Sequence, residues 1–359
     1  MSLRRLEIAD FRLFTHGVFV PEEEGTTVIS GANGTGKTSV LEAIAYLGSG
    51  RSFRGAPREA LVRTAQTRAI VRAELQAGES AVLVEAEIVP GSRSRIQLNR
   101  KPIRSRKDQA TAVPYTIFSP EDLALVNGGP SGRRDLLDDA LAILDPEGSR
   151  AAEEVERILR QRAALLRQAS GRLNEEVERT LEIWDERLVR ASQILVNARE
   201  RLVTGLAGHV AEAYGRLAGS DTASLVRLEY QRSWEGELHD ALRMRRNDDL
   251  RRAVTTVGPH RDDVLVELDQ REARTHASQG EQRCLALALR LGVHRLVCTQ
   301  TDLVPTLLLD DVFSELDPAR SRALVAELPA GQSILTTAAP LPEGIEIGRI
   351  LPISAVLLP

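Results

Sequence analysis

The chain has 359 residues, of which 42% are hydrophobic and 27% charged, and its formal net charge is −4. A chain of this length is longer than one core usually serves, which predicts two domains or one domain with a large insertion. The negative net charge excludes a protein that is basic over its whole surface, so a DNA-binding surface must be local or formed by assembly.

The first third of the chain is predicted to be rich in strands. Charged residues interrupt every apolar run near the start, and no stretch approaches the ~20 apolar residues of a membrane span. We therefore expect a cytoplasmic protein with no secretory segment and no membrane contact. Short or alternating apolar runs predict strands at residues 3–9, 26–30, 69–75, 81–89 and 115–118, and Asn99-Arg100-Lys101 predicts a hairpin turn.

A phosphate-binding motif lies between the second strand and a helix predicted at residues 39–47. The segment fits G-x-x-x-x-G-K-[ST] at every fixed position, as Gly31-Ala32-Asn33-Gly34-Thr35-Gly36-Lys37-Thr38. Glycines let backbone amides turn toward a phosphate, so we expect Lys37 to reach the β and γ phosphates of ATP and Thr38 to hold Mg²⁺. Only three of the 47 basic residues are lysines, which favours a specific role for Lys37. The alternative is a plain glycine-rich turn.

From Gly132 to about Leu250 the hydrophobic period becomes helical, and an antiparallel helical hairpin is expected. Ordinary helix packing is favoured over an oligomerising coiled coil. A helix from Leu173 to Leu217 would extend at most ~68 Å, and Gly205 and Gly208 are expected to break it, which predicts a short arm. The apolar heptad stripe consists of Val177, Leu181, Trp184, Leu188, Ala191, Leu195, Ala198 and Leu202, with an earlier apolar face at Val155, Ile158, Leu165 and Leu166.

Strands and helices alternate again in the last third of the chain. Strands are expected at residues 264–268, 306–310 and 333–336, and helices at 279–298 and 318–328. This pattern around a phosphate-binding loop predicts an α/β fold with a mostly parallel sheet whose ligand binds at the carboxyl edge. Cys284 and Cys298, ~21 Å apart on one helix, are too far apart for a disulfide and are expected to be core positions.

Two acidic residues follow a buried apolar strand at Leu307-Leu308-Leu309. A carboxylate at the end of such a strand can hold the Mg²⁺ shell, and a second one can orient or deprotonate water. We assign Asp310 to the metal and Asp311 to the water, with Lys37 as the third catalytic residue. An acidic pair alone is a weak signal, but its position after a P-loop strengthens it.

The segment Ser278-Gln279-Gly280-Glu281 precedes the acidic pair and opens a predicted helix. Ser278 and Glu281 fit a capping box. A capped helix N-terminus with a glycine is also an anion site, so the segment is predicted to receive the γ-phosphate of ATP bound to a second copy of the chain. Both interpretations can hold together. Likewise, Asp317 before Pro318 is expected either in a subunit-contacting turn or as a helix N-cap.

The chain resembles the RecF family of recombination mediators, ABC-type ATPases related to the SMC proteins. The resemblance implies a P-loop ABC-type ATPase head at residues 1–120 and 251–359, a helical lobe with a short antiparallel arm at 121–250, ATP-dependent homodimerisation and slow hydrolysis. It also implies DNA repair, replication and SOS roles, in which RecR, or RecR with RecO, helps to load recombinase at single-strand gaps. Besides the ATP motifs, it rests on Asp10-Phe11-Arg12, Gly50-Arg51-Ser52-Phe53-Arg54, Phe118-Ser119-Pro120-Glu121-Asp122-Leu123, Arg133-Arg134 with Leu136-Leu137-Asp138, and Gly258-Pro259-His260-Arg261-Asp262-Asp263.

The chain departs from the wider ABC pattern in four places. Asp311 replaces a glutamate, Gln279 replaces the first glycine of Ser-Gly-Gly, and Thr336-Thr337 stand where transporters have a γ-phosphate-sensing histidine. No glutamine stands in 118–123, which leaves the distal metal ligand unassigned. We therefore expect ATP to act as a switch rather than as fuel. The alternatives are a transporter motor ATPase, disfavoured by the helical insertion and the missing histidine, and a long-armed SMC-like protein, disfavoured by the short arm.

Two basic clusters are candidates for binding the DNA backbone without sequence readout. The second, Arg243 to Arg252, is diluted by Asp248 and Asp249 and is interpreted as a solvated face. By position in the fold, Arg12 is expected near the phosphates of ATP and residues 51–54 beside the site, unless Arg12 is merely an exposed charge. The first cluster contains no acidic residue and is equally compatible with a solvated hairpin; it comprises Arg93, Arg95, Arg100, Lys101, Arg104, Arg106 and Lys107.

Overall fold

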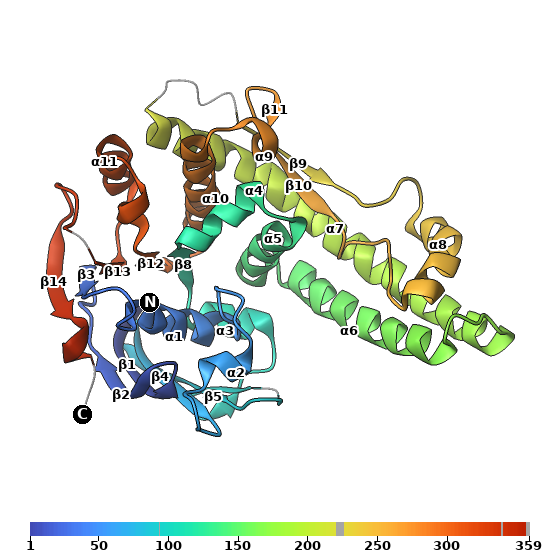
Figure 1. Ribbon diagram of the computed structural model, residues 1–359, viewed down its shortest axis with the longest axis horizontal. Coiled ribbons are helices and arrows are strands. Elements are labelled where there is room, and N and C mark those ends of the chain that lie inside the picture. The colour runs from blue at the N-terminus through green and yellow to red at the C-terminus, as the bar shows by residue number, and fades with distance from the viewer. Residues whose placement is uncertain (93, 220–225, 339, 357–359) are drawn as a thin grey trace. The chain divides into compact units, whose positions relative to one another are not determined.

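The computed structural model describes all residues except 93, 220–225, 339 and 357–359 (Figure 1). The chain divides into two compact units, which we call the head and the lobe. The head contains Met1–Leu123, His209–Ala223 and Ser278–Pro359, and the lobe contains Ala124–Gly208 and Ser224–Ala277. This division differs from the sequence-based boundaries in three places, because residues 121–123 and His209–Ala223 belong to the head and residues 251–277 to the lobe.

The head contains an antiparallel sheet near its N-terminus. Its strand order is β2-β1-β4-β5-β6-β7. Alternate side chains such as Leu6, Ile8 and Val71 face the core, as the period of a half-buried strand requires. Asn99 and Arg100 have positive φ angles of 48° and 66° between β6 and β7, which confirms the predicted hairpin turn. The bounds are β1 Ser2–Phe11, β2 Phe14–Phe19, β4 Ala69–Ala77, β5 Ser80–Ile88, β6 Arg95–Leu98 and β7 Lys101–Pro102.

A parallel sheet forms the second layer of strands in the head. Its order is β14-β3-β13-β12-β8, and every neighbouring pair is parallel. Asp310 pairs in register with Thr336, and Thr337 with Ser30, so three strands end at the same edge. The mostly exposed β14 was not predicted, because it lacks the apolar run of the other four strands. The bounds are β3 Gly25–Ser30, β8 Tyr115–Phe118, β12 Thr306–Asp310, β13 Gln332–Thr337 and β14 Ile347–Pro352.

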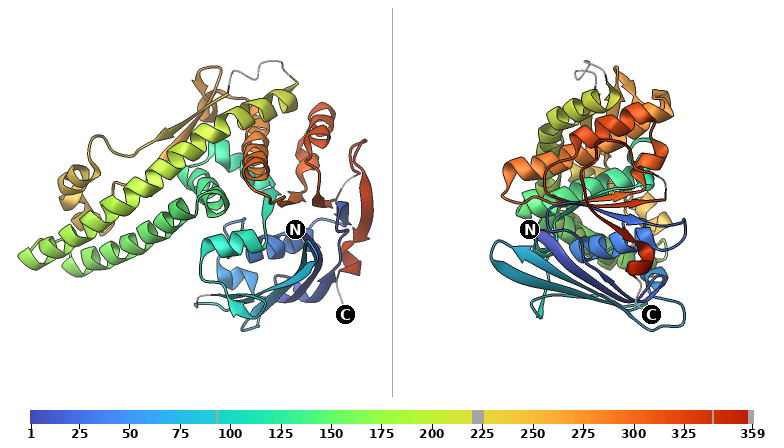
Figure 2. Two further views of the ribbon diagram at one scale, coloured as in Figure 1. Left: turned by 180° about the vertical axis from the view of Figure 1, so that it is seen from behind. Right: turned by 90° about the vertical axis from the view of Figure 1, so that its left-hand side faces the viewer.

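Helix α1 (Lys37–Ser49) lies between the two sheets of the head. It contacts β1 and β4 of one sheet and β12 and β13 of the other, and nearly all its side chains are buried. Helices α10 (Gln279–Gln300) and α11 (Pro318–Glu327) cover the other face of the parallel sheet (Figures 1 and 2). The head also contains the short helices α2 (Arg58–Leu61) and α3 (Arg106–Ala112). On α10, Cys284 is buried and Cys298 half-buried, and both are free, so only Cys284 is a core position.

Helices α6 (Pro146–Ala169) and α7 (Glu175–Ala218) form the predicted helical hairpin and lie side by side in both figures. The predicted stripe is buried against the chain itself, since Leu166, Leu181 and Leu250 form one core. The predicted break at Gly205 and Gly208 is wrong, because α7 runs unbroken for 44 residues, about 66 Å. Buried side chains flank these glycines, and their packing offsets the low helix propensity of glycine.

The rest of the lobe combines short helices with a small antiparallel sheet of order β11-β10-β9. Strand β9 interrupts the segment that was predicted to be helical, so that prediction is wrong there. The bounds are α4 Ala124–Asn127, α5 Pro130–Leu144, β9 Val226–Gln231, α8 Leu238–Arg252, β10 Asp263–Leu268, β11 Arg271–Glu272 and α9 Ala273–His276.

The Gly258-Pro259-His260-Arg261-Asp262-Asp263 motif joins the elements of the lobe. Arg133 binds the Asp263 carboxylate at 2.7 and 2.8 Å, and Arg199 donates to the Pro259 carbonyl at 2.7 Å. The fully buried Asp262 accepts hydrogen bonds from the Tyr230 hydroxyl and from the Ser233 backbone. Helices α5 and α7 and strand β9 thus meet at this motif, which gives the sequence motif a structural role.

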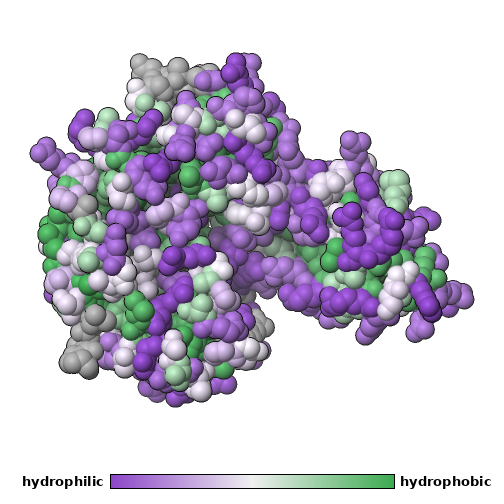
Figure 3. All heavy atoms as spheres, viewed as in Figure 1, coloured by the Kyte–Doolittle hydropathy of each residue, from purple (hydrophilic) through white to green (hydrophobic). Residues whose placement is uncertain are grey.

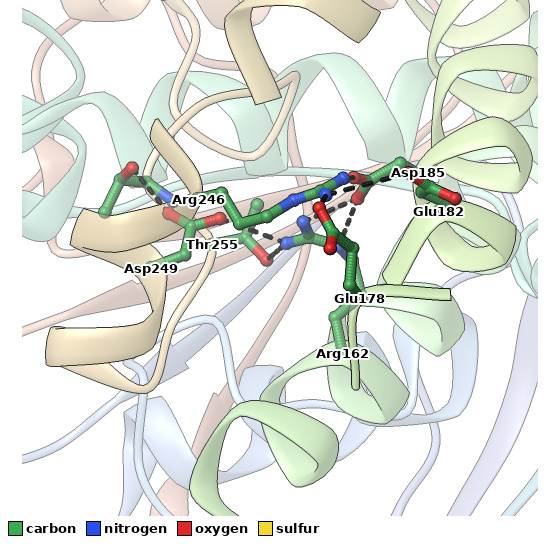
Figure 4. Close-up of polar contacts among 8 residues, drawn as sticks. Arg162, Glu178, Glu182, Asp185, Arg246, Asp249 and Thr255 are labelled. Carbon is green, nitrogen blue, oxygen red and sulfur yellow. Dashed lines mark hydrogen bonds and ion pairs between the residues drawn. The ribbon is translucent and has the colours of Figure 1, made fainter. Parts of the chain in front are cut away.

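A second buried polar cluster links α6, α7 and α8 (Figure 4). Asp185 accepts hydrogen bonds from Arg162 at 2.6 Å and from Arg246 at 3.1 Å, and Arg162 also pairs with Asp249 at 3.2 Å. Arg246 is therefore buried, and Arg245 and Arg251 both pair with Asp248. Three of the five arginines of the second basic cluster are therefore paired with carboxylates, whereas Arg243 and Arg252 are exposed.

The structure contains no transmembrane helix among the described residues. None of the described helices is both long and apolar enough to cross a bilayer. Figure 3 shows mostly hydrophilic residues on the face it displays, with hydrophobic residues in separate small patches.

Candidate nucleotide-binding site

The P-loop connects the end of β3 to the start of α1, as predicted. Gly34 and Gly36 have φ angles of 79° and 98°, a left-handed region that favours glycine. The loop leads directly into the first turn of α1, whose free amide groups would face an anion bound in the loop. Lys37 is the first residue of that helix and is only 7% exposed.

The Lys37 ammonium group lies inside the loop. It donates hydrogen bonds to the carbonyl oxygens of Gly31 and Ala32, at 2.8 and 2.9 Å. These contacts fix the long side chain across the concave side of the loop. Phosphate oxygens entering the loop would be stronger acceptors than these neutral carbonyls, because both partners would be charged.

Asp310 lies directly opposite the start of α1, at the carboxyl end of β12. Its Oδ1 accepts hydrogen bonds from the hydroxyls of Thr38 at 2.8 Å and Thr336 at 2.7 Å. Burial raises the pKa of Asp310, while the two hydroxyl bonds lower it. A hydroxyl and a carboxylate supply the hard oxygen ligands that Mg²⁺ prefers, so this pair fits a magnesium ion coordinated also by phosphate and water.

Asp311 follows Asp310 in a left-handed conformation, with φ of 48°. Its backbone N–H donates to the Thr336 carbonyl at 3.2 Å and to the Thr336 hydroxyl at 3.1 Å. Thr336 therefore positions both acidic residues from the neighbouring strand β13. The Asp311 side chain is half-exposed and lines the same cleft as Lys37, where it can orient water.

The P-loop borders one cleft of about 670 Å³ in the head. Its lining brings together Asn33, Gly34, Gly36, Lys37, Thr38, Asp310, Asp311 and Thr336 with Arg12 and Arg54. The sequence-based assignment of Arg12 to the cleft agrees with this position. The guanidinium group, however, is already paired with the buried Glu42 carboxylate, at 2.7 Å for both of its hydrogen bonds.

Ser278 caps α10 in the capping box that the sequence predicted. Its hydroxyl accepts from the Glu281 N–H at 3.3 Å, and the Glu281 carboxylate accepts from the Ser278 N–H at 2.7 Å. The Arg320 guanidinium lies over Gly280, where a Cβ would come within 2.5 Å of it, and pairs with Asp317. Asp317 also caps α11. Within the described part of the chain, the segment Ser278–Glu281 does not line the P-loop cleft.

The segment Phe118–Leu123, which lacks a glutamine, is anchored by two carboxylates. Asp122 is buried, pairs with Arg290 at 2.6 Å and accepts from the Ser119 N–H at 2.9 Å. Burial raises the pKa of Asp122, and Arg290 opposes this shift. Glu121 pairs with Arg54, which lines the cleft, at 3.1 Å. The segment, which contains no glutamine, therefore reaches the cleft through the ion pair between Glu121 and Arg54.

The first basic cluster lies on the β6–β7 hairpin and at the start of α3. Arg95, Arg100, Lys101, Arg104 and Lys107 are exposed, and none of these five forms an ion pair with a described residue. Arg106 is half-buried, and Arg93 lies outside the described residues. The hairpin therefore presents unneutralised positive charge on the head.

Comparison of the sequence with known proteins assigns the chain to a family. The chain matches the model of the RecF/RecN/SMC N-terminal domain over residues 2–337. It is 39% identical, over 363 aligned positions, to the DNA replication and repair protein RecF of Acidothermus cellulolyticus, covering 97% of this chain and 96% of that protein. The chain belongs to the RecF family.

Solved structures support the same fold. The structure described as the recombination mediator protein RecF–ATP of the RecFOR pathway matches with a TM-score of 0.85 and 26% identity, covering 96% of this chain and 93% of that one. An Smc head bound to the C-terminal winged-helix domain of ScpA matches with a TM-score of 0.53 and 16% identity, covering 94% and 90%. The head of this RecF-family chain thus has the ABC/SMC-type ATPase fold.

Sequence reasoning missed two contributors to this RecF-family site. Thr336 was noted only as the replacement for a histidine, whereas the structure places its hydroxyl on Asp310. Its position on a strand next to the P-loop strand was the available signal. Glu42 was also missed, and it accepts hydrogen bonds from Arg12 and Ser52. A buried glutamate inside an apolar helix was a sign that it had a basic partner.

Proposed function

We propose that the chain is an ATP-dependent DNA-binding protein of recombinational repair, in which ATP acts as a switch. The observation that carries this proposal is the convergence of Lys37, Thr38 and Asp310 at one edge of the parallel sheet. Membership of the RecF family and the likeness to a RecF–ATP structure support ATP as the nucleotide. The alternative is that the P-loop segment is only a glycine-rich turn that binds no phosphate. That interpretation does not explain why the Thr38 hydroxyl contacts the Asp310 carboxylate.

The residues of the cleft divide the phosphate chemistry among them. Lys37 and the amides of the first turn of α1 bind the β and γ phosphates. Thr38 and Asp310 would hold Mg²⁺, which neutralises phosphate charge when it is bound. Asp311 orients the attacking water, and its short side chain together with Thr336 in place of a histidine favours slow hydrolysis.

The second half of the site comes, in this proposal, from another copy of the chain. Ser278 caps the N-terminus of α10 and does not line the P-loop cleft of its own chain, so in this proposal the helix N-terminus binds the γ-phosphate of another copy. ATP would then join two heads, and hydrolysis would release them. The exposed cations of the β6–β7 hairpin support DNA backbone binding. We also propose cooperation with RecR, or with RecR and RecO, at single-strand gaps, and the likeness to a recombination mediator of the RecFOR pathway supports it.

Sedimentation velocity with and without Mg²⁺ and ATP tests the dimer. The wild-type chain is expected to sediment as a dimer only with ATP, whereas Ser278→Arg should bind ATP and stay monomeric, because the new side chain fills the phosphate site. Ser105→Arg is the matched control, since Ser105 also caps a helix, at 3.1 Å from the Asp108 nitrogen. An ATP-induced dimer of Ser278→Arg would refute the role of this segment.

A further inference from the structure

Residues 347–356, which we call the C-terminal segment, lie along the strand that leads into the P-loop. The segment begins with β14, which pairs in parallel with β3 at the margin of the parallel sheet (Figure 1). The last pair of this ladder joins Pro352 to Ser30, the residue before the P-loop. The ladder therefore stops where the P-loop begins, and the segment continues into the short 3₁₀ helix η4 (Ile353–Ala355).

Ile353, the first residue of η4, packs against the first glycine of the P-loop. Its side chain is only 6% exposed and belongs to the large apolar core of the head. A Cβ placed on Gly31 would lie 2.8 Å from Ile353 Cγ2, which is too short a separation for two carbon atoms. The Ile353 side chain therefore occupies the space that a side chain at position 31 would need, and the P-loop backbone lies directly on it.

The end of the C-terminal segment is attached to the antiparallel sheet. Val356 is buried, and its carbonyl oxygen accepts a hydrogen bond from the Val18 N–H of β2 at 2.9 Å. A Cβ on Gly17 would lie 3.1 Å from the same carbonyl oxygen, so the two backbones are in close contact. Ile353 is thus held by a parallel ladder before it and by a hydrogen bond to β2 after it, and both fix its position against Gly31.

The strand that precedes Ile353 has little burial of its own. Five of the six residues of β14 are exposed, and Ile350 is 57% exposed. The attachment of the C-terminal segment therefore depends on the ladder with β3 and on the two buried side chains of Ile353 and Val356. A change at Ile353 should loosen this segment and the loop beside it while the rest of the head stays folded.

We propose that Ile353 is a positioning residue for phosphate binding, which acts by holding Gly31 in place. Ile353 does not line the P-loop cleft, so its effect on a phosphate passes through the loop. The Gly31 carbonyl accepts a hydrogen bond from the Lys37 ammonium group at 2.8 Å, so a displaced Gly31 would also displace Lys37. A loop that is already held in its binding conformation loses less conformational entropy when the ligand binds.

Hydrogen exchange of the nucleotide-free chain tests the packing of Ile353 on the loop without any ligand. Ile353→Ala should speed exchange of the amides in residues 31–37 by about tenfold. Ile353→Val keeps the Cγ2 methyl group that lies against Gly31 and should exchange like the wild type. Ile88→Ala is the matched control, because it removes the same atoms from the same core on β5 and should leave residues 31–37 unchanged.

Calorimetric titration with Mg²⁺ and ATP, or with inorganic tripolyphosphate, tests the effect on phosphate binding, which rests on the proposed function. Ile353→Ala should weaken both ligands by about tenfold, because both are bound through their phosphates. Ile353→Val and Ile88→Ala should bind them like the wild type. Ile353→Leu keeps the side-chain volume but moves the branch away from Cβ, so it should fold and weaken both ligands to a smaller extent.

The two measurements separate the failure of this inference from the failure of the proposed function. Unchanged exchange in residues 31–37, or unchanged affinity for both ligands, in folded Ile353→Ala and Ile353→Leu would overturn the positioning role. Equal losses of affinity in Ile353→Ala and Ile88→Ala would also overturn it, because they would reflect lower stability of the whole head. A wild-type chain that binds neither ligand would refute the nucleotide site itself, and with it any role of Ile353 in phosphate binding.

Discussion

Asp310 in the head and Asp185 in the lobe are both buried carboxylates, but their charges are compensated differently. Asp185 lies between the guanidinium groups of Arg162 and Arg246, at 2.6 and 3.1 Å (Figure 4). Asp310 accepts hydrogen bonds from two threonine hydroxyls and forms no ion pair with a described residue. The lobe cluster is complete without a ligand, whereas the head keeps an uncompensated negative charge beside a cleft. Burial alone therefore does not identify a functional carboxylate, but its partners do.

Replacing each of these two carboxylates by an amide should give the largest effects, and it should affect stability in one variant and Mg²⁺–ATP binding in the other. Asp185→Asn should lower the free energy of unfolding by about 3–5 kcal/mol, because it leaves two buried guanidinium groups without a full counter-charge. Urea denaturation checks this value. Under conditions in which Asp185→Asn is folded, it should bind ATP with the affinity of the wild type.

Asp310→Asn should show the opposite pattern, with unchanged stability and weaker binding of Mg²⁺–ATP. Asp310→Asn removes a carboxylate whose pKa is raised by burial, so it should not destabilise the metal-free chain at neutral pH. It should, however, weaken binding of Mg²⁺ with ATP in titration calorimetry. A large loss of stability in Asp310→Asn, or a loss of ATP binding in folded Asp185→Asn, would remove the distinction between the two regions.

Acid pH should lower the stability of both regions through one histidine in each, His260 being half-buried in the lobe and His294 buried in the head. Burial lowers the pKa of His260 in the lobe and of His294 in the head to about 4. Both are therefore neutral in the folded state at pH 5, while the unfolded chain takes up a proton below about 6.5. The free energy of unfolding should fall as pH drops from 6.5 to about 4, by up to about 3 kcal/mol for each histidine.

Denaturation curves at several pH values test the histidine contributions separately. His260→Gln and His294→Gln should each flatten the pH dependence over that window, whatever their effect at pH 7. The exposed His16 provides the control, and His16→Gln should leave the slope unchanged. A wild-type stability that is constant from pH 6.5 to 4 would contradict the assignment for both regions.

DNA binding should distinguish the basic surface of the head from the basic helix of the lobe. Replacing Arg100, Lys101 and Arg104 together by glutamine should lower DNA affinity by about tenfold and reduce its salt dependence. Fluorescence anisotropy at several salt concentrations measures both quantities. The matched triple replacement of Arg243, Arg245 and Arg251 should have little effect, because Asp248 already neutralises two of these arginines. Equal losses in the two triple variants would assign DNA binding to another surface.

The sequence predicted the parts of the head whose signals are local. A continuous apolar run marked Thr306–Asp310 to the residue, and the P-loop motif marked the start of α1. The capping box at Ser278 was also visible, because its two partners lie three residues apart. Contacts between distant segments were not visible in the sequence. The Thr336–Asp310 pair depends on which strands become neighbours, and the Arg12–Glu42 pair depends on how α1 packs beside the end of β1.

The lobe was harder to predict because its polar residues are used inside the fold. Arg246 looks like part of a basic surface in sequence, yet it is buried against Asp185 from α7. His260 and its neighbours formed a specific motif without a physical explanation until α5, α7 and β9 were seen to meet there. Helix propensity failed at Gly205 and Gly208 for a related reason, since packing decides whether a long helix continues.

The smallest expected effect tests that last point directly. No atom lies within 4 Å of a Cβ placed on Gly208, so Gly208→Ala should raise the free energy of unfolding by about 1 kcal/mol, because alanine has the higher helix propensity. Gly292→Ala is the matched control on α10, where the Cβ would come within 2.6 Å of Val210 Cγ2 and should destabilise the chain. Thermal denaturation of the two variants should therefore show shifts of opposite sign. A destabilised Gly208→Ala would mean that α7 needs a flexible residue at this position, as the sequence first indicated.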